Sequence, residues 1–186
     1  MGQYYKAVIK EHGAKTWKSF DSWTFNSGAK LMEHSYVPNF FVMYIKNLIF
    51  DTPTRVVWAG DYAENEKGKD DNLYILAKEQ QVLTTCGMEG LHDLLVQKLP
   101  EMRYLVNDSK KLYVDYSKIQ EDSWGYKIDP LPLLCAEGNG QGGGDYWGKN
   151  EGLVGSWARD FISITSEIPQ GYKELVPEFR EGRDLE

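Results

Sequence analysis

The hydrophobic periodicity of this chain changes along its length, and this change constrains the fold more than any other feature. Three segments show the short apolar run or the alternation that is typical of strands: Tyr4–Lys10, Arg55–Ala59 and Phe161–Thr165. Two others repeat apolar side chains every three or four positions, as helices do: residues 41–49 and Glu89–Leu99. Because the two kinds of segment do not alternate in a βαβ rhythm, we predict an α+β fold, a mostly antiparallel sheet with two main helices packed on it.

Shorter patterns predict the rest of the sheet. Tyr104–Val106 and Leu112–Val114 flank a turn-forming segment and indicate a hairpin. Leu131–Leu134 is apolar but is framed by Pro130 and Pro132, which favours an edge strand or an extended segment. Two further segments are predicted as strands, Thr16–Phe20 and Leu73–Ala77.

The length of 186 residues fits one domain, and an apolar share of 41% is enough to bury a core. Neither an internal repeat nor a domain linker stands out in the sequence. The last residues are rich in charge, as terminal segments outside a core often are. We therefore predict a single domain over residues 1–176, followed by an acidic tail, residues 177–186, that frays.

The net charge of −7 argues against a general binder of nucleic acid or of anionic membranes, because such proteins are normally basic. The charge is also uneven. Residues 1–50 carry six lysines and three acids, a net charge of +3, whereas residues 51–186 carry 15 basic and 25 acidic residues, a net charge of −10. With only two cysteines and no long apolar run, we expect a soluble, cytoplasmic protein.

A glycine-rich segment follows Glu137, and residues 138–155 contain eight of the 18 glycines of the chain. Its spacing matches the phosphate-binding patterns G-x-G-x-x-G and G-x-x-x-x-G-K only in part, because the residues that should follow are missing. A turn-forming surface loop, a small-ligand loop and a partner-contact loop all fit this composition. For a ligand loop, the candidate residues are Gly138, Asn139, Gly140, Gly142, Gly143, Asp145 and the cationic Arg159.

One histidine has acidic neighbours that suit acid–base chemistry. His34 follows Glu33, and Asp61 comes directly after the strand predicted over Arg55–Ala59. If the protein is an enzyme, these three side chains are the catalytic candidates. A structural interpretation is equally open, since Ser35 or Asn39 could cap the helix that follows. The histidines and cysteines lack metal-ligand spacing, so we expect no metal and no cofactor.

The segment Asp61–Asn72 contains five acidic residues and two lysines. Such a segment is often only a solvated face. Concentrated carboxylates also complement the electrostatic field of a basic nucleic-acid-binding groove on another protein. On that interpretation the candidate partner-binding residues are Asp61, Glu64, Glu66, Asp70 and Asp71.

Three stretches, residues 30–36 (KLMEHSY), residues 58–63 (WAGDYA) and Pro130–Gly144, resemble those of a family of small proteins encoded by phages, prophages and gut bacteria. The resemblance extends over most of the chain. That family has no settled activity, so it assigns no functional residue here. It implies a product of a mobile element, and small acidic proteins of this kind are often counter-defence factors.

Two functions from different classes follow. We expect a non-enzymatic, anti-CRISPR-like inhibitor that acts in the host cytoplasm, and whose partner is a host nuclease with a basic nucleic-acid-binding surface. The alternative is a small-ligand protein, a nucleotide-binding sponge or a hydrolase, that uses Gly138–Gly144 with Asp145, His34 and Asp61. A structural phage component is a third class. We expect no direct contact with nucleic acid or membrane.

Overall fold

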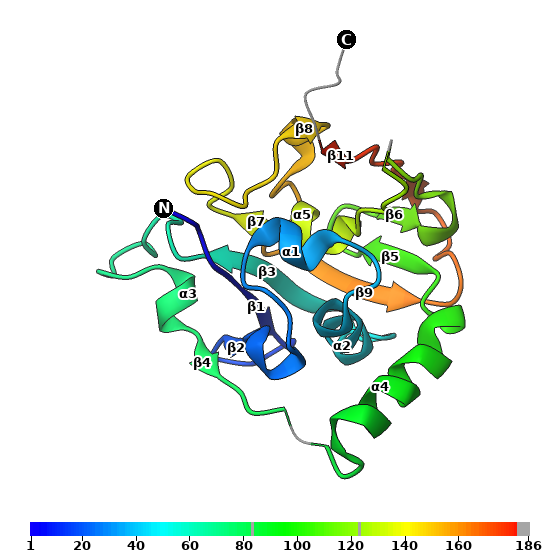
Figure 1. Ribbon diagram of the computed structural model, residues 1–186, viewed down its shortest axis with the longest axis horizontal. Helices are drawn as coiled ribbons and strands as arrows, with labels where there is room; N and C mark the ends of the chain where they lie inside the picture. Colours follow the sequence, from blue (N-terminus) through cyan, green and yellow to red (C-terminus); the bar gives the residue numbers. More distant parts are fainter. Residues whose placement is uncertain (83, 123, 182–186) are drawn as a thin grey trace.

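The computed structural model describes residues 1–82, 84–122 and 124–181 (Figure 1). Within these residues the chain forms a nine-stranded mixed sheet, a separate two-stranded ribbon and five α-helices. The strands are β1 (Tyr5–Lys10), β2 (Lys18–Phe20), β3 (Thr54–Gly60), β4 (Lys78–Glu79), β5 (Tyr104–Asn107), β6 (Leu112–Asp115), β7 (Ala136–Glu137), β8 (Gly148–Lys149), β9 (Phe161–Thr165), β10 (Lys173–Glu174) and β11 (Arg180–Glu181). The α-helices are α1 (Leu31–Ser35), α2 (Phe40–Leu48), α3 (Leu73–Leu76), α4 (Gly87–Lys98) and α5 (Pro130–Leu134).

The large sheet has the order β10-β6-β5-β9-β3-β1-β2-β4, and β7 pairs with β3 beside this path. The central pairs are antiparallel, whereas β4, β7 and β10 each join a neighbour in parallel. The prediction of mixed α and β structure with a mostly antiparallel sheet is therefore confirmed, and the hairpin β5–β6 lies where the sequence predicted it.

The longest strand pair of the sheet is β1–β3, in which Ala7 lies opposite Trp58. Alternation along both strands separates two apolar faces. Val56 and Trp58 belong to the larger core, and Val57 and Ala59 belong to a smaller one on the other face. Because both faces of β1 and β3 are covered, most of their residues are apolar and the two strands show apolar runs in the sequence.

The larger face is covered by α1, α2 and α5 (Figure 1). Helix α2 begins after Asn39, whose side chain accepts the Val42 amide at 3.1 Å, so the capping interpretation is confirmed for this residue. In contrast, α4 lies at the periphery, and Leu95 is its only buried residue among those described. The fold therefore differs from the predicted arrangement of two main helices on the sheet. Helix α4 packs at the edge, and three short helices also cover the sheet.

Two segments predicted to be extended are helical. Leu73–Ala77 was predicted as a strand, but it forms α3, since Asn72 caps its first turn through the Ile75 amide. Leu131–Leu134 forms α5. Its N-cap is Asp129, which accepts the Leu131 amide at 3.1 Å, and the first helical position is Pro130, where a missing N–H costs nothing.

The chain beyond Pro177 is paired as far as the structure describes it. Strand β11 pairs with β8, and the buried Phe179 ring packs edge-on against Tyr146. An aromatic contact and a strand pair therefore attach residues 177–181 to the fold in the structure, and the fraying of the tail stays a prediction. Residues 182–186 of the expected tail lie outside the described residues. Within the described part of the chain, none of the helices has the length and apolar character needed to cross a membrane.

Candidate functional site

His34 lies in α1 and is completely buried. Its Nδ1 accepts a hydrogen bond from the Trp58 indole at 3.0 Å, and its Nε2 lies 2.8 Å from the Gly28 carbonyl oxygen. Because Nδ1 accepts, the neutral ring carries its proton on Nε2 and donates it to Gly28. Burial lowers the pKa of His34 to about 4. Both ring nitrogens are committed to the fold, which gives His34 a structural role.

The two acidic residues predicted to act with His34 also bind backbone groups. The Glu33 carboxylate accepts the Lys30 amide at 2.9 Å and closes the first turn of α1. The Asp61 carboxylate, at the end of β3, accepts the Tyr4 amide at 3.0 Å. Each member of the expected acid–base set therefore has a separate structural partner, so the geometry does not support the set.

Asp145 is buried at the centre of the glycine-rich segment. Its Oδ2 accepts the backbone amides of Gly140, Gln141 and Gly142 at 2.7, 2.8 and 2.9 Å, and its Oδ1 accepts the Tyr5 hydroxyl at 2.9 Å. Successive amides that converge on one anion form a nest. The cradle that the sequence suggested for a ligand anion is thus filled by the carboxylate of the protein itself.

Other residues of the glycine-rich segment are also hydrogen-bonded within the fold. The Gly143 amide donates to the Met1 carbonyl at 3.0 Å, and the Asn139 side chain accepts the Tyr146 amide at 2.8 Å. Gly138 adopts a φ of 97°, which favours glycine. Asp145, expected to assist ligand binding, instead organises a closed turn.

The acidic loop, residues 61–72, is also folded. The Glu66 amide donates to the Asp71 carbonyl at 3.0 Å, and the Asn72 side chain donates to the Asp61 carbonyl at 2.9 Å. The loop therefore presents a fixed surface. Three of its five acidic residues are exposed on that surface: Glu64, Asp70 and Asp71.

A polar cavity of about 520 Å³ lies between the acidic loop and the glycine-rich segment. Residues 63–67 line one side, and the other side is lined by Glu137, Gly138, Asn139, Gln141 and Arg159. The structure thus brings together candidates that the sequence placed in two different sites. Gly140, Gly142, Gly143 and Asp145 do not line the cavity.

Arg159 joins the two walls of the cavity. Its guanidinium donates to Glu137 at 2.5 and 2.9 Å and to Glu66 at 3.0 Å, with a second, shorter contact to Glu66. The guanidinium lowers the pKa of Glu66 through these hydrogen bonds. Because two carboxylates enclose its charge, Arg159 is not the free cation that the sequence suggested for an anionic ligand.

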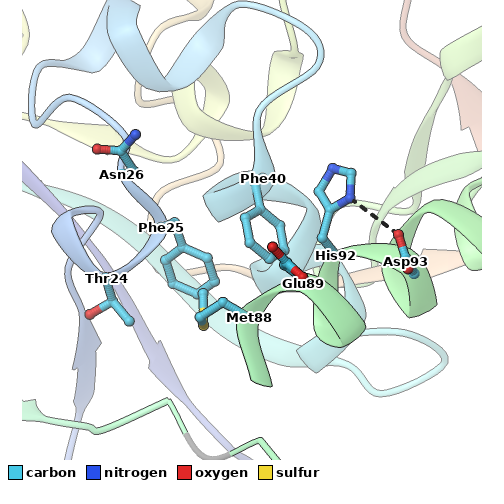
Figure 2. A pocket seen from close by; sticks show the side chains of 8 residues that line it. All are labelled: Thr24, Phe25, Asn26, Phe40, Met88, Glu89, His92 and Asp93. Atoms are coloured by element: carbon cyan, nitrogen blue, oxygen red, sulfur yellow. Dashed lines mark ion pairs between the residues drawn. The ribbon is translucent and has the colours of Figure 1, made fainter. Parts of the chain in front are cut away.

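A second, apolar pocket of about 470 Å³ lies between the start of α2 and α4. Figure 2 shows the Phe25, Phe40 and Met88 side chains gathered in it, with His92 and Asp93 at the edge. The His92 ring packs edge-on against the Phe40 ring, with 5.0 Å between the ring centroids. The sequence gives no sign of this pocket, because Phe25 and Met88 are distant in the chain.

Three residues at or near the polar cavity were not predicted from the sequence: Gln3, Tyr5 and Glu137. Tyr5 reads only as part of a strand, yet its hydroxyl holds Asp145. Glu137 immediately precedes the glycine-rich segment, and an acid in that place was the one available signal. Gln3 is completely buried, a position that its polarity does not suggest.

Among the described residues, no group of three or more His, Cys, Asp or Glu side chains is placed to hold a metal ion. Comparisons of the chain with protein families, with curated proteins and with solved structures found no match. The geometry of the acidic loop and of the glycine-rich segment is therefore the evidence that bears on function.

Proposed function

We propose that the protein is a non-enzymatic binding protein whose acidic loop engages a basic nucleic-acid-binding surface of another protein. In the phage context that the sequence resemblance suggests, this partner would be a host nuclease and the protein its inhibitor. The observation that carries the proposal is the order of the acidic loop, which presents Glu64, Asp70 and Asp71 as exposed carboxylates on a fixed frame.

Apolar side chains beside the carboxylates give this surface the character of an interface. Tyr62 precedes Glu64, and α3, which follows the loop, exposes Ile75 and Leu76. Protein interfaces combine an apolar centre with a polar rim. The acids would then guide a basic partner, and the apolar side chains would hold it.

The buried groups favour binding over catalysis. His34 and Asp145 were the strongest candidates for chemistry, and the fold uses both. Asp70 and Asp71 stabilise the acidic loop through their backbone carbonyls, which accept hydrogen bonds from the Asn65 side chain and the Glu66 amide. These hydrogen bonds do not use the exposed carboxylates of the two residues.

The test uses a panel of purified nucleases with basic nucleic-acid channels. We expect the protein to inhibit at least one of them, with an association rate that falls steeply between about 50 and about 500 mM salt. The double substitution Asp70→Asn and Asp71→Asn should slow association about tenfold at low salt and change dissociation little.

The matched control replaces two exposed acids outside the loop, Glu101→Gln and Glu167→Gln, which changes the net charge equally. If both double variants slow association to the same extent, total charge and not the acidic loop attracts the partner. If no nuclease is bound or inhibited at low salt, the proposal fails.

A further inference from the structure

The polar cavity between the two loops shares Glu64 with the exposed acids but does not include Asp70 or Asp71, and its lining has a chemistry of its own. Five charged side chains line it: Glu64, Glu66, Lys67, Glu137 and Arg159. Its volume of about 520 Å³ falls within the range of small-molecule sites, roughly 300–1,000 Å³. Three segments that are remote in sequence form it, and the Arg159 ion pairs fix its walls.

The charge balance argues against an ionic ligand. Three carboxylates face two cations, and the Arg159 guanidinium is already enclosed by Glu66 and Glu137. A phosphate would meet uncompensated carboxylates, and the amides that could have bound it hold Asp145. A compact cation would meet Arg159 and Lys67 in the same space. An uncharged ligand avoids both repulsions.

The lining offers hydrogen-bond acceptors and donors side by side. Each paired carboxylate keeps lone pairs that Arg159 does not use, and Gln141 presents an exposed amide. A hydroxyl group donates one hydrogen bond and accepts others, so neighbouring hydroxyls match such a surface. Hydrogen bonds to charged groups are the stronger ones, and here the charged groups are already oriented by each other.

The wall behind Gly138 adds a second, independent observation. Gln3 is completely buried, and neither polar atom of its amide has a hydrogen-bond partner among the described residues. A Cβ atom on Gly138 would lie 2.4 Å from the Gln3 amide nitrogen and 3.1 Å from the Ala63 amide. Gly138 and Ala63 both line the cavity. The unpartnered amide therefore lies directly behind the lining residue Gly138, whereas buried polar groups normally have partners.

Two exposed aromatic side chains belong to the same loops, although neither ring is part of the cavity lining. Tyr62 directly precedes the lining residue Ala63 and is partly exposed, and the exposed Trp147 ring reaches to within 3.9 Å of a Cβ built on Gly140. Rings with an exposed face pack against apolar C–H groups. A sugar combines such C–H groups with adjacent hydroxyls. From the charge balance and the hydrogen-bonding groups of the lining, we infer that the cavity binds a small uncharged saccharide, a mono- or disaccharide.

The experiment is an NMR titration of the full chain that follows the backbone amides. The probes are glucose, galactose, mannose, N-acetylglucosamine, maltose and lactose, with ADP and free arginine as the anionic and cationic comparisons. We expect at least one sugar to give saturable shifts confined to residues 63–67 and 137–141. ADP and arginine should leave these residues unshifted.

Two variants test the lining. Glu137→Gln should raise the sugar dissociation constant about tenfold or more, and Gln141→Ala about threefold to tenfold, as expected for a charged and a neutral hydrogen bond. The matched controls are Glu174→Gln, an acid of similar exposure that is paired with Lys118, and Gln97→Ala on α4. Both controls should bind the sugar as the parent chain does.

Three results would overturn the inference: no shifts with any sugar at tens of millimolar, sugar shifts outside the two loops, or equal losses in the variants and their controls. Binding of ADP to these loops would instead make the cavity an anion site. The result is separable from the proposed protein–protein function, since the Asp70→Asn and Asp71→Asn variant should keep its sugar affinity.

Discussion

At Asp145, one buried carboxylate offsets the entropy cost of ordering a glycine-rich turn. Glycine loses more conformational freedom on folding than any other residue. The three amides that converge on Oδ2, with the Tyr5 hydroxyl on Oδ1, provide charge-assisted hydrogen bonds that are stronger than neutral ones. The turn is therefore held by an acid that a search for ligand loops would assign to a ligand.

Asp145→Asn keeps the shape of this side chain and removes its charge. We expect the free energy of unfolding to fall by about 1–3 kcal/mol, because charge-assisted hydrogen bonds become neutral and the Tyr5 hydroxyl must change from donor to acceptor. Urea denaturation followed by tryptophan fluorescence measures the loss. Asp93→Asn, on the exposed surface of α4, is the control and should change stability by less than about 0.5 kcal/mol. Equal losses in the two variants would contradict the role of the nest.

His34 should make stability depend on pH. Its pKa is about 4 in the folded protein and near 6.5 when unfolded. Between these values the unfolded chain binds a proton that the folded chain does not, so stability falls as the pH falls from about 7 to about 4. The expected loss from this group is about 3 kcal/mol. Denaturation at a series of pH values measures it.

A substitution separates the contribution of His34 from that of titrating carboxylates. His34→Gln should lower stability at pH 7, since Trp58 and Gly28 lose well-placed partners. It should also flatten the pH profile between about 4 and 6.5 relative to the parent chain. His92→Gln, at a half-exposed position, should leave the profile unchanged. A parent-like slope in His34→Gln would show that His34 is not its source.

At the scale of elements, Asp129 connects two helices. It caps α5, and its carboxylate also binds the buried Lys46 ammonium from α2 and accepts the Tyr116 hydroxyl at 3.2 Å. Lys46 also lies 3.8 Å from the centre of the Tyr116 ring. A buried cation that loses its carboxylate partner is costly, whereas removing both charges is not.

Asp129→Asn should therefore lower the free energy of unfolding by about 3–5 kcal/mol, because it leaves the Lys46 charge uncompensated while asparagine still caps α5. Adding Lys46→Met should restore at least about 1 kcal/mol of that loss. A double-mutant cycle in urea measures both values. Strictly additive losses would mean that the two side chains do not interact.

The same elements show what the sequence could predict. The strands with clear apolar runs, β1, β3 and β9, and the hairpin β5–β6 follow from local pattern. The helix α5 does not, because two prolines read as a break until Asp129 is seen to cap the turn that begins at Pro130. A short helix such as α3 depends on its cap and on tertiary packing. The hydrophobic pattern of its four residues alone does not distinguish it from a strand.

Several residues of the candidate site could be predicted from the sequence, but the contacts between them could not. Glu66, Gly138 and Arg159 were each singled out from the sequence, but under two different functions. Their meeting depends on contacts between Glu66 and Arg159, which lie 93 positions apart. A nest of amides likewise gives no local sign of which anion fills it, and Asp145 reads equally as a ligand-binding residue.

At the scale of the whole molecule, stability is distributed unevenly, and amide hydrogen exchange should report it. Strand β3 pairs on both sides and is buried on both faces, whereas α4 buries Leu95 alone and lies at the edge of the fold (Figure 1). Amides of β3 should exchange only through global unfolding, with a strong dependence on denaturant, and those of α4 through local opening with little dependence. Helix α2, which is largely buried, is the matched control and should behave as β3 does. Equal exchange free energies in α4 and β3 would contradict this, and would mean that the apolar pocket beside α4 has rigid walls on both sides.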